Sequence, residues 1–204
     1  MTQLIDKKES RSLKGHFLIA MPNMADERFK KAVVYICSHS PEGAMGIVIN
    51  QLAQGFRFSD LLSQLNISPG LEAITFSGRL KGIDVYRGGP VETSRGFVLH
   101  SPDYFIARTT QSVGSKICLT ATLDILKAVA EGGGPQDLLF ALGYAGWTAG
   151  QLEQEIESNG WLSCEAIPEV IFRAAAHERY DEVLKIIGIE PKDIALLSLT
   201  AGHA

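Results

Sequence analysis

The stretch GYAGWTAGQLEQEIESNGWL, residues Gly143–Leu162, carries the strongest structural signals of the chain and predicts a strand that turns directly into a helix. Its first half contains small and aromatic residues and no charge, which is typical of a buried strand whose glycines let neighbouring backbone approach closely. Its second half predicts a helix, which Asn159 or Gly160 would end in the left-handed conformation. This strand-to-helix corner is the best specified part of the predicted fold.

The start of that helix has a specific sequence signature. Thr148 at the N-cap and Gln151 at N3 predict a capping box, in which each side chain satisfies a backbone N–H of the other residue. Trp147 and Leu152 are placed to form the accompanying hydrophobic staple. The helix N-terminus would therefore have few free N–H groups for an external ligand.

Further elements are predicted on both sides of this corner. Apolar and β-branched runs predict short strands at residues 16–20, 32–39, 44–50, 73–76, 83–87, 96–100, 114–119, 161–166 and 170–172, beside the central strand at 138–147. Capping residues and amphipathic spacing predict helices at 26–31, 59–65, 122–131 and 177–187. Strands and helices are interspersed without regular β-α-β alternation, which favours an α+β domain with a mixed sheet.

The composition is that of one globular domain. The chain has 204 residues, of which 46% are hydrophobic and 21% charged, enough to bury one sizeable core. Residues 1–14 carry charges of both signs and no apolar core segment, so a flexible leader is expected before a domain at 15–204. No run approaches the roughly 18 to 20 apolar residues of a membrane helix, and a cytoplasmic location without membrane contact is expected.

Five blocks of sequence occur in an order that points to a known family. They are FLIAMPNMADERFKKAVVYICSHSPEGAMGIVIN from Phe17, VYRGGPV from Val85, GFVLHS from Gly96, the corner described above and the C-terminal GHA. Together they resemble the YqgE/AlgH family of small bacterial proteins, over nearly the whole chain from Gly15 onward. The chain departs from the family pattern in RAAAHERY, where Tyr180 replaces the usual Trp of an E-x-R-W-type helix start.

The resemblance implies a single α+β domain in which a mixed, bifurcated β-sheet forms a pseudo-barrel with helices packed around it. Some members are called transcriptional regulators, a name that rests on a genetic role in exopolysaccharide control and not on a known DNA-binding site. The family has no agreed catalytic residues, so none is assigned to this chain. The preferred functional expectation is a non-enzymatic cytosolic regulatory or protein-interaction module that uses no cofactor and no metal.

Direct nucleic-acid binding is not expected, because the charges oppose it. The net charge is −4 at pH 7, and from Ala128 to Phe172 the chain has no Lys or Arg. The same stretch contains seven acidic residues: Glu131, Asp137, Glu153, Glu155, Glu157, Glu165 and Glu169. A recognition helix needs cations to neutralise phosphates, so the helix at 122–131 is not interpreted as part of a helix-turn-helix.

No common catalytic spacing occurs, since G-x-S-x-G, S-x-x-K and H-E-x-x-H are all absent. Cys37 and His39 lie two residues apart on one predicted strand, so their side chains would share a face and could form a thiol–imidazole pair. The simpler interpretation is a reduced core thiol, as expected also for Cys118 and Cys164. A metal site would need Cys37, His39 and His100 to converge from neighbouring strands.

The triplet Arg87-Gly88-Gly89 is the clearest anion-binding signal, because it places a cation beside flexible backbone N–H groups. Tight turns are the other use of such glycines. The alternative functional hypothesis is a small-molecule or anion-binding protein, or a weak hydrolase. Its site would lie in a concave pocket that gathers several of five residues: Arg87, Gly88, Gly89, His100 and His39.

Glu153, Glu155 and Glu157 crowd the C-terminal end of the corner helix, where carboxylates oppose the helix dipole. A solvated acidic face is the ordinary reason for such a run. The sharper hypothesis is that the three glutamates form an acidic docking face for a basic protein partner. The sequence does not specify the oligomeric state.

Overall fold

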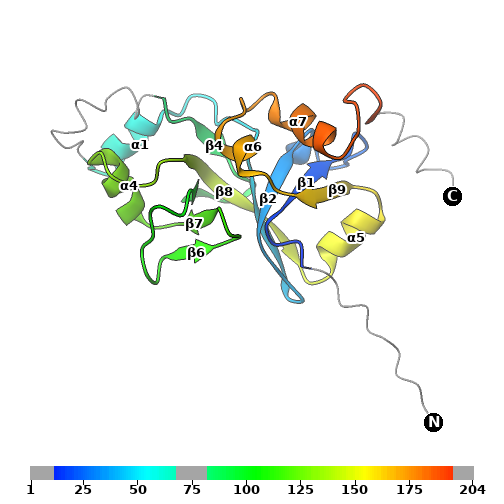
Figure 1. Ribbon diagram of the computed structural model, residues 1–204, viewed down its shortest axis with the longest axis horizontal. Helices are drawn as coiled ribbons and strands as arrows, with labels where there is room; N and C mark the ends of the chain where they lie inside the picture. The colour runs from blue at the N-terminus through cyan, green and yellow to red at the C-terminus, as the bar shows by residue number, and fades with distance from the viewer. Residues whose placement is uncertain (1–11, 68–81, 195–204) are drawn as a thin grey trace, which may run out of the picture.

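Strand β8, Leu138–Thr148, lies at the centre of the sheet and pairs with three other strands (Figure 1). In the computed structural model, which describes residues 12–67 and 82–194, the sheet has nine strands. Their order is β6-β7-β5-β8-β3-β2-β1-β9, with β4 also paired to β8. The neighbours of β8 are β3, Gly43–Val48, and β5, Val91–His100, both antiparallel, and β4, Val85–Arg87, which is parallel. The sheet is therefore mixed and branches at β8, as expected.

The other elements complete a single α+β domain whose curled sheet forms a half-barrel (Figure 1). The remaining strands are β1, His16–Ala20; β2, Val33–Ser40; β6, Thr110–Ser112; β7, Cys118–Thr120; and β9, Trp161–Glu165. The described helices are α1, Phe58–Gln64; α4, Leu123–Ala130; α5, Gln151–Glu157; α6, Pro168–Phe172; and α7, Arg179–Ile186, with a short 3₁₀ helix at Glu27–Phe29. Strands β2 and β3 form the predicted hairpin.

Gly143 is the point at which β8 changes sides. Before it, Phe140 packs with α1 and α4, while Leu139 packs inside the half-barrel. After it, Tyr144 packs inside and Trp147 packs with α5. Gly143 has a φ of 73°, and this left-handed residue shifts the strand alternation by one position. One strand can therefore contribute to the inner layer and to two separate outer layers.

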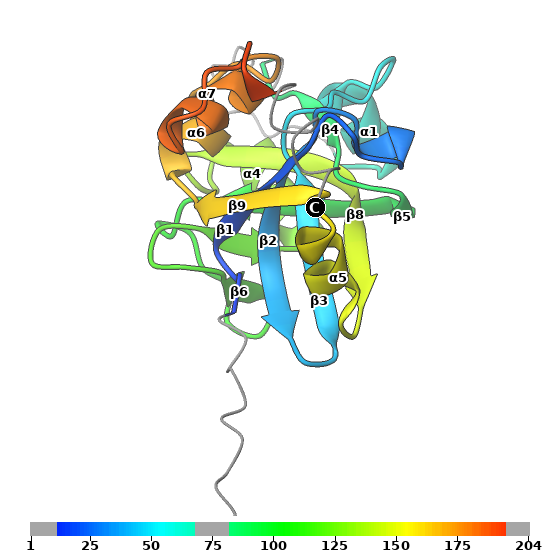
Figure 2. The same ribbon diagram turned by 90° about the vertical axis from the view of Figure 1, so that its right-hand side faces the viewer.

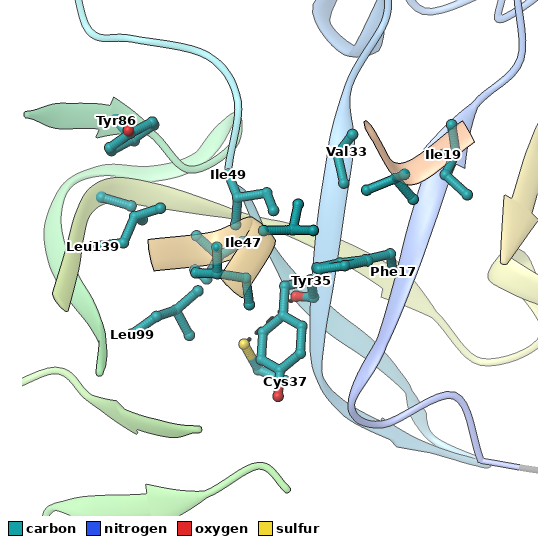
Figure 3. Packing of buried hydrophobic residues seen from close by; sticks show 14 of the residues in the cluster. Phe17, Ile19, Val33, Tyr35, Cys37, Ile47, Ile49, Tyr86, Leu99 and Leu139 are labelled. Carbon is teal, nitrogen blue, oxygen red and sulfur yellow. Dashed lines mark hydrogen bonds between the residues drawn. The ribbon is translucent and has the colours of Figure 1, made fainter. Parts of the chain in front are cut away.

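Three apolar clusters fill those layers. The inner cluster contains Phe17, Tyr35 and Leu139 (Figure 3). Buried residues of α6 and α7 pack against it. A second cluster lies under α1 and α4, and the third packs α5 against the β1–β2–β3 part of the sheet (Figure 2). Tyr180, the residue that departs from the family pattern, is buried and donates its hydroxyl to the carbonyl of Ala20 at 2.7 Å.

Two local predictions need correction. Residues 170–172 belong to helix α6 and not to a strand, because Pro168 presets the first turn of a helix whose buried face holds Val170 and Ile171. Helix α5 has Gly150 at its N-cap, in place of Thr148. Half of the capping box is nevertheless present, since Gln151 Oε1 accepts the backbone N–H of Thr148 at 3.0 Å.

Other boundaries moved by a few residues. Strand β5 begins at Val91 and not at 96, and the predicted strand at 114–119 is the shorter β7, paired with an unpredicted β6. The left-handed end of α5 is Asn159, with a φ of 56°. The predicted strand at 73–76 and parts of both termini, 1–11 and 195–204, lie outside the described residues. The division between a leader at 1–14 and a domain at 15–204 stays a prediction.

Candidate functional site

The glycines of Arg87-Gly88-Gly89 allow a close backbone crossing with β8. The N–H of Gly88 donates to the carbonyl of Leu142, and the carbonyl of Gly88 accepts the N–H of Val48, both at 2.8 Å. A Cβ atom on Gly89 would lie 2.1 Å from the carbonyl carbon of Tyr144. Packing therefore explains these glycines, and the backbone groups of Gly88 already have partners.

His100 lies in the interior of the same half of the sheet. Its Nδ1–H donates to the carbonyl of Ser101 at 2.8 Å, so Nε2 is the acceptor for the hydroxyl of Thr120 at 2.9 Å. Thr120 in turn shares a hydrogen bond of 2.8 Å with Thr110. Burial lowers the pKa of His100 below its ordinary value. Both ring nitrogens thus have internal structural roles.

Cys37 and His39 face opposite sides of β2, so they do not form a thiol–imidazole pair, and the simpler interpretation of Cys37 as a core thiol agrees with the structure. A β-bulge beside Cys37 breaks the alternation by which residues two apart share a face. Cys37 is buried in the inner cluster, and burial raises the pKa of its thiol (Figure 3). His39 faces α5, where it contacts Glu153 Oε1 at 2.8 Å, while its Nδ1 accepts the N–H of Leu13 at 2.9 Å.

The residues of the sequence-based anion or hydrolase hypothesis are therefore dispersed. His39 lies between β2 and α5, and His100 lies between β5 and β7. Arg87 is exposed and lines a groove of about 550 Å³ with Leu52 and Phe56. The described residues do not bring these side chains into one pocket. Nor do three His, Cys, Asp or Glu side chains gather as a metal site within the described ranges.

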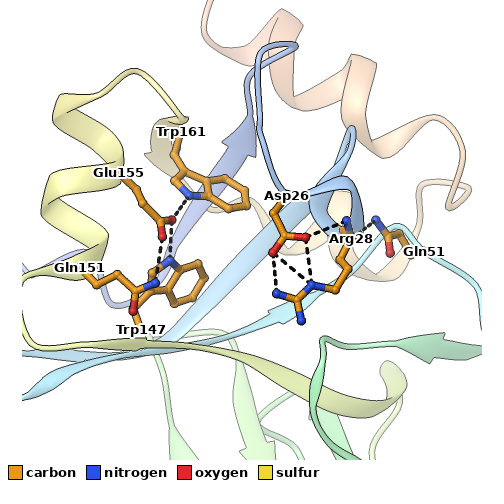
Figure 4. A network of polar contacts seen from close by, with 7 residues as sticks. All are labelled: Asp26, Arg28, Gln51, Trp147, Gln151, Glu155 and Trp161. Carbon is orange, nitrogen blue, oxygen red and sulfur yellow. Dashed lines mark hydrogen bonds and ion pairs between the residues drawn. The ribbon is translucent and has the colours of Figure 1, made fainter.

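The three glutamates of α5 do not share one face, because consecutive helix residues are rotated by about 100°. Glu155 is turned inward: its Oε2 accepts the indole N–H of Trp147 at 2.9 Å and that of Trp161 at 2.7 Å (Figure 4). Glu153 contacts His39, and Glu157 is exposed. The acidic run thus includes an internal structural residue, and a single solvated acidic face does not form.

An apolar surface runs from the loop before α1 to the facing sides of α1 and α4, and we call it the α1–α4 groove. It consists of the groove at Arg87 and a second hollow of about 230 Å³, and Leu142 lines both. The described chain has eight large exposed hydrophobic residues, and four of them line this groove: Leu52, Phe56, Leu65 and Leu123. Phe56 is 59% exposed and Leu123 is 49% exposed. Such clustering of exposed apolar side chains is typical of an interaction surface.

A second cleft of about 810 Å³ lies between α6–α7 and the ends of β4 and β8, and we call it the Arg179 cleft. It borders the groove at Arg87, since Leu52 and Gln54 line both. Arg179 lines it although the residue is only 4% exposed. The guanidinium donates to the carbonyls of Ala174 and Ile49, and its Cζ lies 4.9 Å from the ring centre of Tyr86. Burial lowers the pKa of Arg179, and the neighbouring phenol opposes that shift.

Comparison with known proteins decides the family. A family model described as AlgH-like matches residues 17–192 of the chain. The chain belongs to the AlgH-like family. Two UPF0301 proteins, from a Methylobacterium species and from Azorhizobium caulinodans, are each 55% identical to it over 192 residues. The match covers 94% of this chain and 90% and 92% of those two relatives.

The AlgH-like fold is also found among solved structures. The solution structure of the AlgH protein from Pseudomonas aeruginosa is 40% identical, with a TM-score of 0.74 over 100% of both chains. A crystal structure of a Corynebacterium diphtheriae protein has a TM-score of 0.67 at 18% identity, covering 96% of this chain and 93% of that one, and shows likeness of fold alone. The described helices of this AlgH-like chain include none long and apolar enough to cross a bilayer.

Sequence reasoning missed both the α1–α4 groove and the Arg179 cleft of this AlgH-like protein. The only signal for Arg179 was its place in HERY, where the family pattern has E-x-R-W. Burial of an arginine depends on which distant segments cover it, and helical spacing does not carry that information. Arg87 was identified from its neighbouring glycines, and the structure places it at the α1–α4 groove.

Proposed function

We propose that this AlgH-like chain is a non-enzymatic protein-interaction module whose α1–α4 groove docks an acidic amphipathic helix of a partner protein. The observation that carries the proposal is that, of the eight large exposed hydrophobic residues in the ranges 12–67 and 82–194, four lie along the two adjoining hollows of this groove. Apolar side chains held in water gain free energy when a partner covers them. A groove of this kind fits the apolar face of a helix with anchors at i, i+3, i+4 and i+7.

The charges beside the groove favour an acidic partner. Arg87 lines the groove and Arg57 follows the exposed Phe56, and neither guanidinium has a hydrogen bond or ion pair with a described residue. Arg95, in the second hollow, is paired with Glu92 at 3.0 Å. Arg57 and Arg87 would steer and orient carboxylates on the rim of an otherwise apolar interface.

The described residues also support a non-enzymatic role. Cys37 is buried with a raised thiol pKa, and the ring nitrogens of His39 and His100 are occupied by structural contacts. A nucleophile needs an accessible base within hydrogen-bond reach. Any regulatory effect of the module would then act through its partner, in keeping with the lack of Lys and Arg from Ala128 to Phe172.

The proposal is tested by selecting amphipathic helical peptides from a display library against the full chain and measuring their affinity by fluorescence anisotropy. The variants are Phe56→Ser and Arg87→Glu, with Phe105→Ser as the matched control, since Phe105 is 57% exposed away from the groove. We expect acidic amphipathic peptides whose binding weakens at least tenfold in both groove variants and weakens with salt, but is unchanged in the control. Absence of selected binders, or equal binding to all three variants, overturns the proposal.

A further inference from the structure

Arg179 is a buried cation held in one position at the wall of the Arg179 cleft. Nε–H donates to the carbonyl of Ala174 at 3.1 Å, and Nη1 donates to the carbonyl of Ile49. The guanidinium also lies over the face of the Tyr86 ring. A guanidinium has five N–H donors, and only two of them donate to backbone carbonyls among the residues that the structure describes. The side chain is thus preorganised for a further acceptor.

The charge of Arg179 is not balanced by a contacting carboxylate within the part of the chain that the structure describes. Among the described residues, no Asp or Glu oxygen lies within ion-pair distance of it. Asp137 lines the same cleft, but its carboxylate is bound to Arg173 at 2.8 Å. Carbonyl dipoles and an aromatic face compensate a buried full charge only in part. An anion entering the cleft would complete this compensation.

The rest of the cleft restricts what kind of anion fits. Asp84 lines the cleft, is exposed, and forms no hydrogen bond or ion pair with a described residue. It contributes a negative charge whose field reaches Arg179. Apolar side chains line the same space, among them Leu139, Ile171 and Phe172. The cleft therefore offers a guanidinium, a carboxylate and an apolar wall to one ligand.

We propose that the Arg179 cleft binds a zwitterionic ligand of the amino-acid or short-peptide class. Its carboxylate pairs with the guanidinium of Arg179, its ammonium group lies toward Asp84, and its apolar side chains contact the Ile171–Phe172 wall. The planar fork of an arginine matches the two oxygens of a carboxylate. A phosphate dianion fits less well, because the exposed carboxylate of Asp84 would repel it, whereas that of Asp137 is compensated by Arg173. The cleft shares Leu52 and Gln54 with the docking groove, but Arg179, Asp84 and the Ile171–Phe172 wall line the cleft alone, so this proposal does not rest on the proposed docking function.

Four small molecules test separately whether the cleft recognises the carboxylate and the ammonium group of its ligand. The probes are the dipeptide leucyl-leucine, its C-terminal amide, its N-acetyl derivative and inorganic phosphate, each titrated into the full ¹⁵N-labelled chain and followed by amide chemical shifts. We expect saturable shifts with leucyl-leucine at Tyr86, Leu139 and Ala175, which line the cleft. Affinity should fall at least tenfold for the amide, which lacks the carboxylate, and several-fold for the acetylated dipeptide, which lacks the ammonium group.

Substitutions in the cleft show which residue is responsible for each loss of affinity. Arg179→Lys keeps the positive charge but loses the planar fork, so it should bind leucyl-leucine more weakly than the wild type. Asp84→Asn should remove the preference for a free ammonium group. Asp60→Asn, on α1, is the control for Asp84, and Phe56→Ser should bind the dipeptide like the wild type because Phe56 does not line this cleft. The comparison of leucyl-leucine with its C-terminal amide uses the wild-type chain, so it does not depend on whether the Arg179 variant folds.

Three results overturn the proposal. The first is the absence of saturable shifts with leucyl-leucine at concentrations on the order of 10 mM. The second is equal affinity for the dipeptide and its amide. The third is stronger binding of inorganic phosphate, which would make the cleft a phosphate site. None of these outcomes affects the peptide-docking experiment, so the two proposals fail independently.

Discussion

Trp161 donates its indole N–H to Oε2 of Glu155 at 2.7 Å, which links the start of β9 to α5 (Figure 4). The same oxygen accepts the indole N–H of Trp147 at the end of β8, at 2.9 Å. Oε1 accepts from Gln151 Nε2 at 3.0 Å. One carboxylate therefore joins three consecutive elements, and its three donors all come from the stretch Gly143–Leu162.

Replacing this carboxylate should destabilise the fold. In Glu155→Gln the new amide NH₂ would have to face either the indole donors or the Gln151 donor, and we expect a loss of about 1–3 kcal/mol in the free energy of unfolding. Urea denaturation measures it. Glu157→Gln, on the exposed side of α5, should stay within about 0.5 kcal/mol of the wild type. Equal midpoints for both variants would show that the link contributes no stability.

Gly143→Ala should be far more damaging. Its Cβ would lie 2.6 Å from the carbonyl oxygen of Gly89 and 2.8 Å from that of Val91, at a φ of 73°. We expect a loss above about 4 kcal/mol, or no folded protein at all. The control is Gly114→Ala, where a Cβ meets nothing within 4 Å and the change should be within about 1 kcal/mol. Thermal unfolding by circular dichroism compares them, and similar midpoints would refute the close-crossing argument.

The cysteines should differ in reactivity. Burial raises the pKa of the Cys37 thiol, and it raises that of half-buried Cys164 to about 11, so neither carries much thiolate at neutral pH. With iodoacetamide we expect slow modification of Cys164 in the folded chain, and modification of Cys37 and Cys118 only after denaturation. Peptide mass mapping after timed quenching identifies the sites. Fast labelling of Cys37 in the folded chain would contradict its assignment as an inert core thiol.

The burial of His100 should lower the free energy of unfolding at acidic pH. Burial lowers its pKa in the folded state, so below the ordinary value near 6.5 the unfolded chain binds a proton that the folded chain excludes. The contribution of the neutral ring to the free energy of unfolding is therefore present above about pH 6.5. Below that pH it decreases, by at most ~1.4 kcal/mol for each pH unit. Urea titrations from neutral pH to about pH 5 should show a shallower slope in His100→Gln. The exposed-ring control His177→Gln should keep the wild-type slope, and an unchanged slope in His100→Gln would exclude this linkage.

The local signals in the sequence were sufficient for much of the fold. The β8–α5 corner, the β2–β3 hairpin and the glycine-terminated helix α4 were predicted close to their observed limits. Such elements are encoded by capping residues, turns and periodicity within a few positions. Helix α6 also had a local signal in Pro168, but the short apolar run after it favoured a strand. The branched sheet followed from the family resemblance and not from the residues alone.

By itself, the amino-acid sequence determined the family, the α+β class and the positions of most strands and helices, because these depend on contiguous residues. Only the tertiary structure decided which side each functional group faces. The bulge at Cys37 separates it from His39, the indoles of Trp147 and Trp161 draw Glu155 inward, and the crossing with β8 accounts for Gly88 and Gly89. The Arg179 cleft and the α1–α4 groove likewise arise where segments distant in sequence meet, because burial and counter-ions are set by packing and not by spacing along the chain.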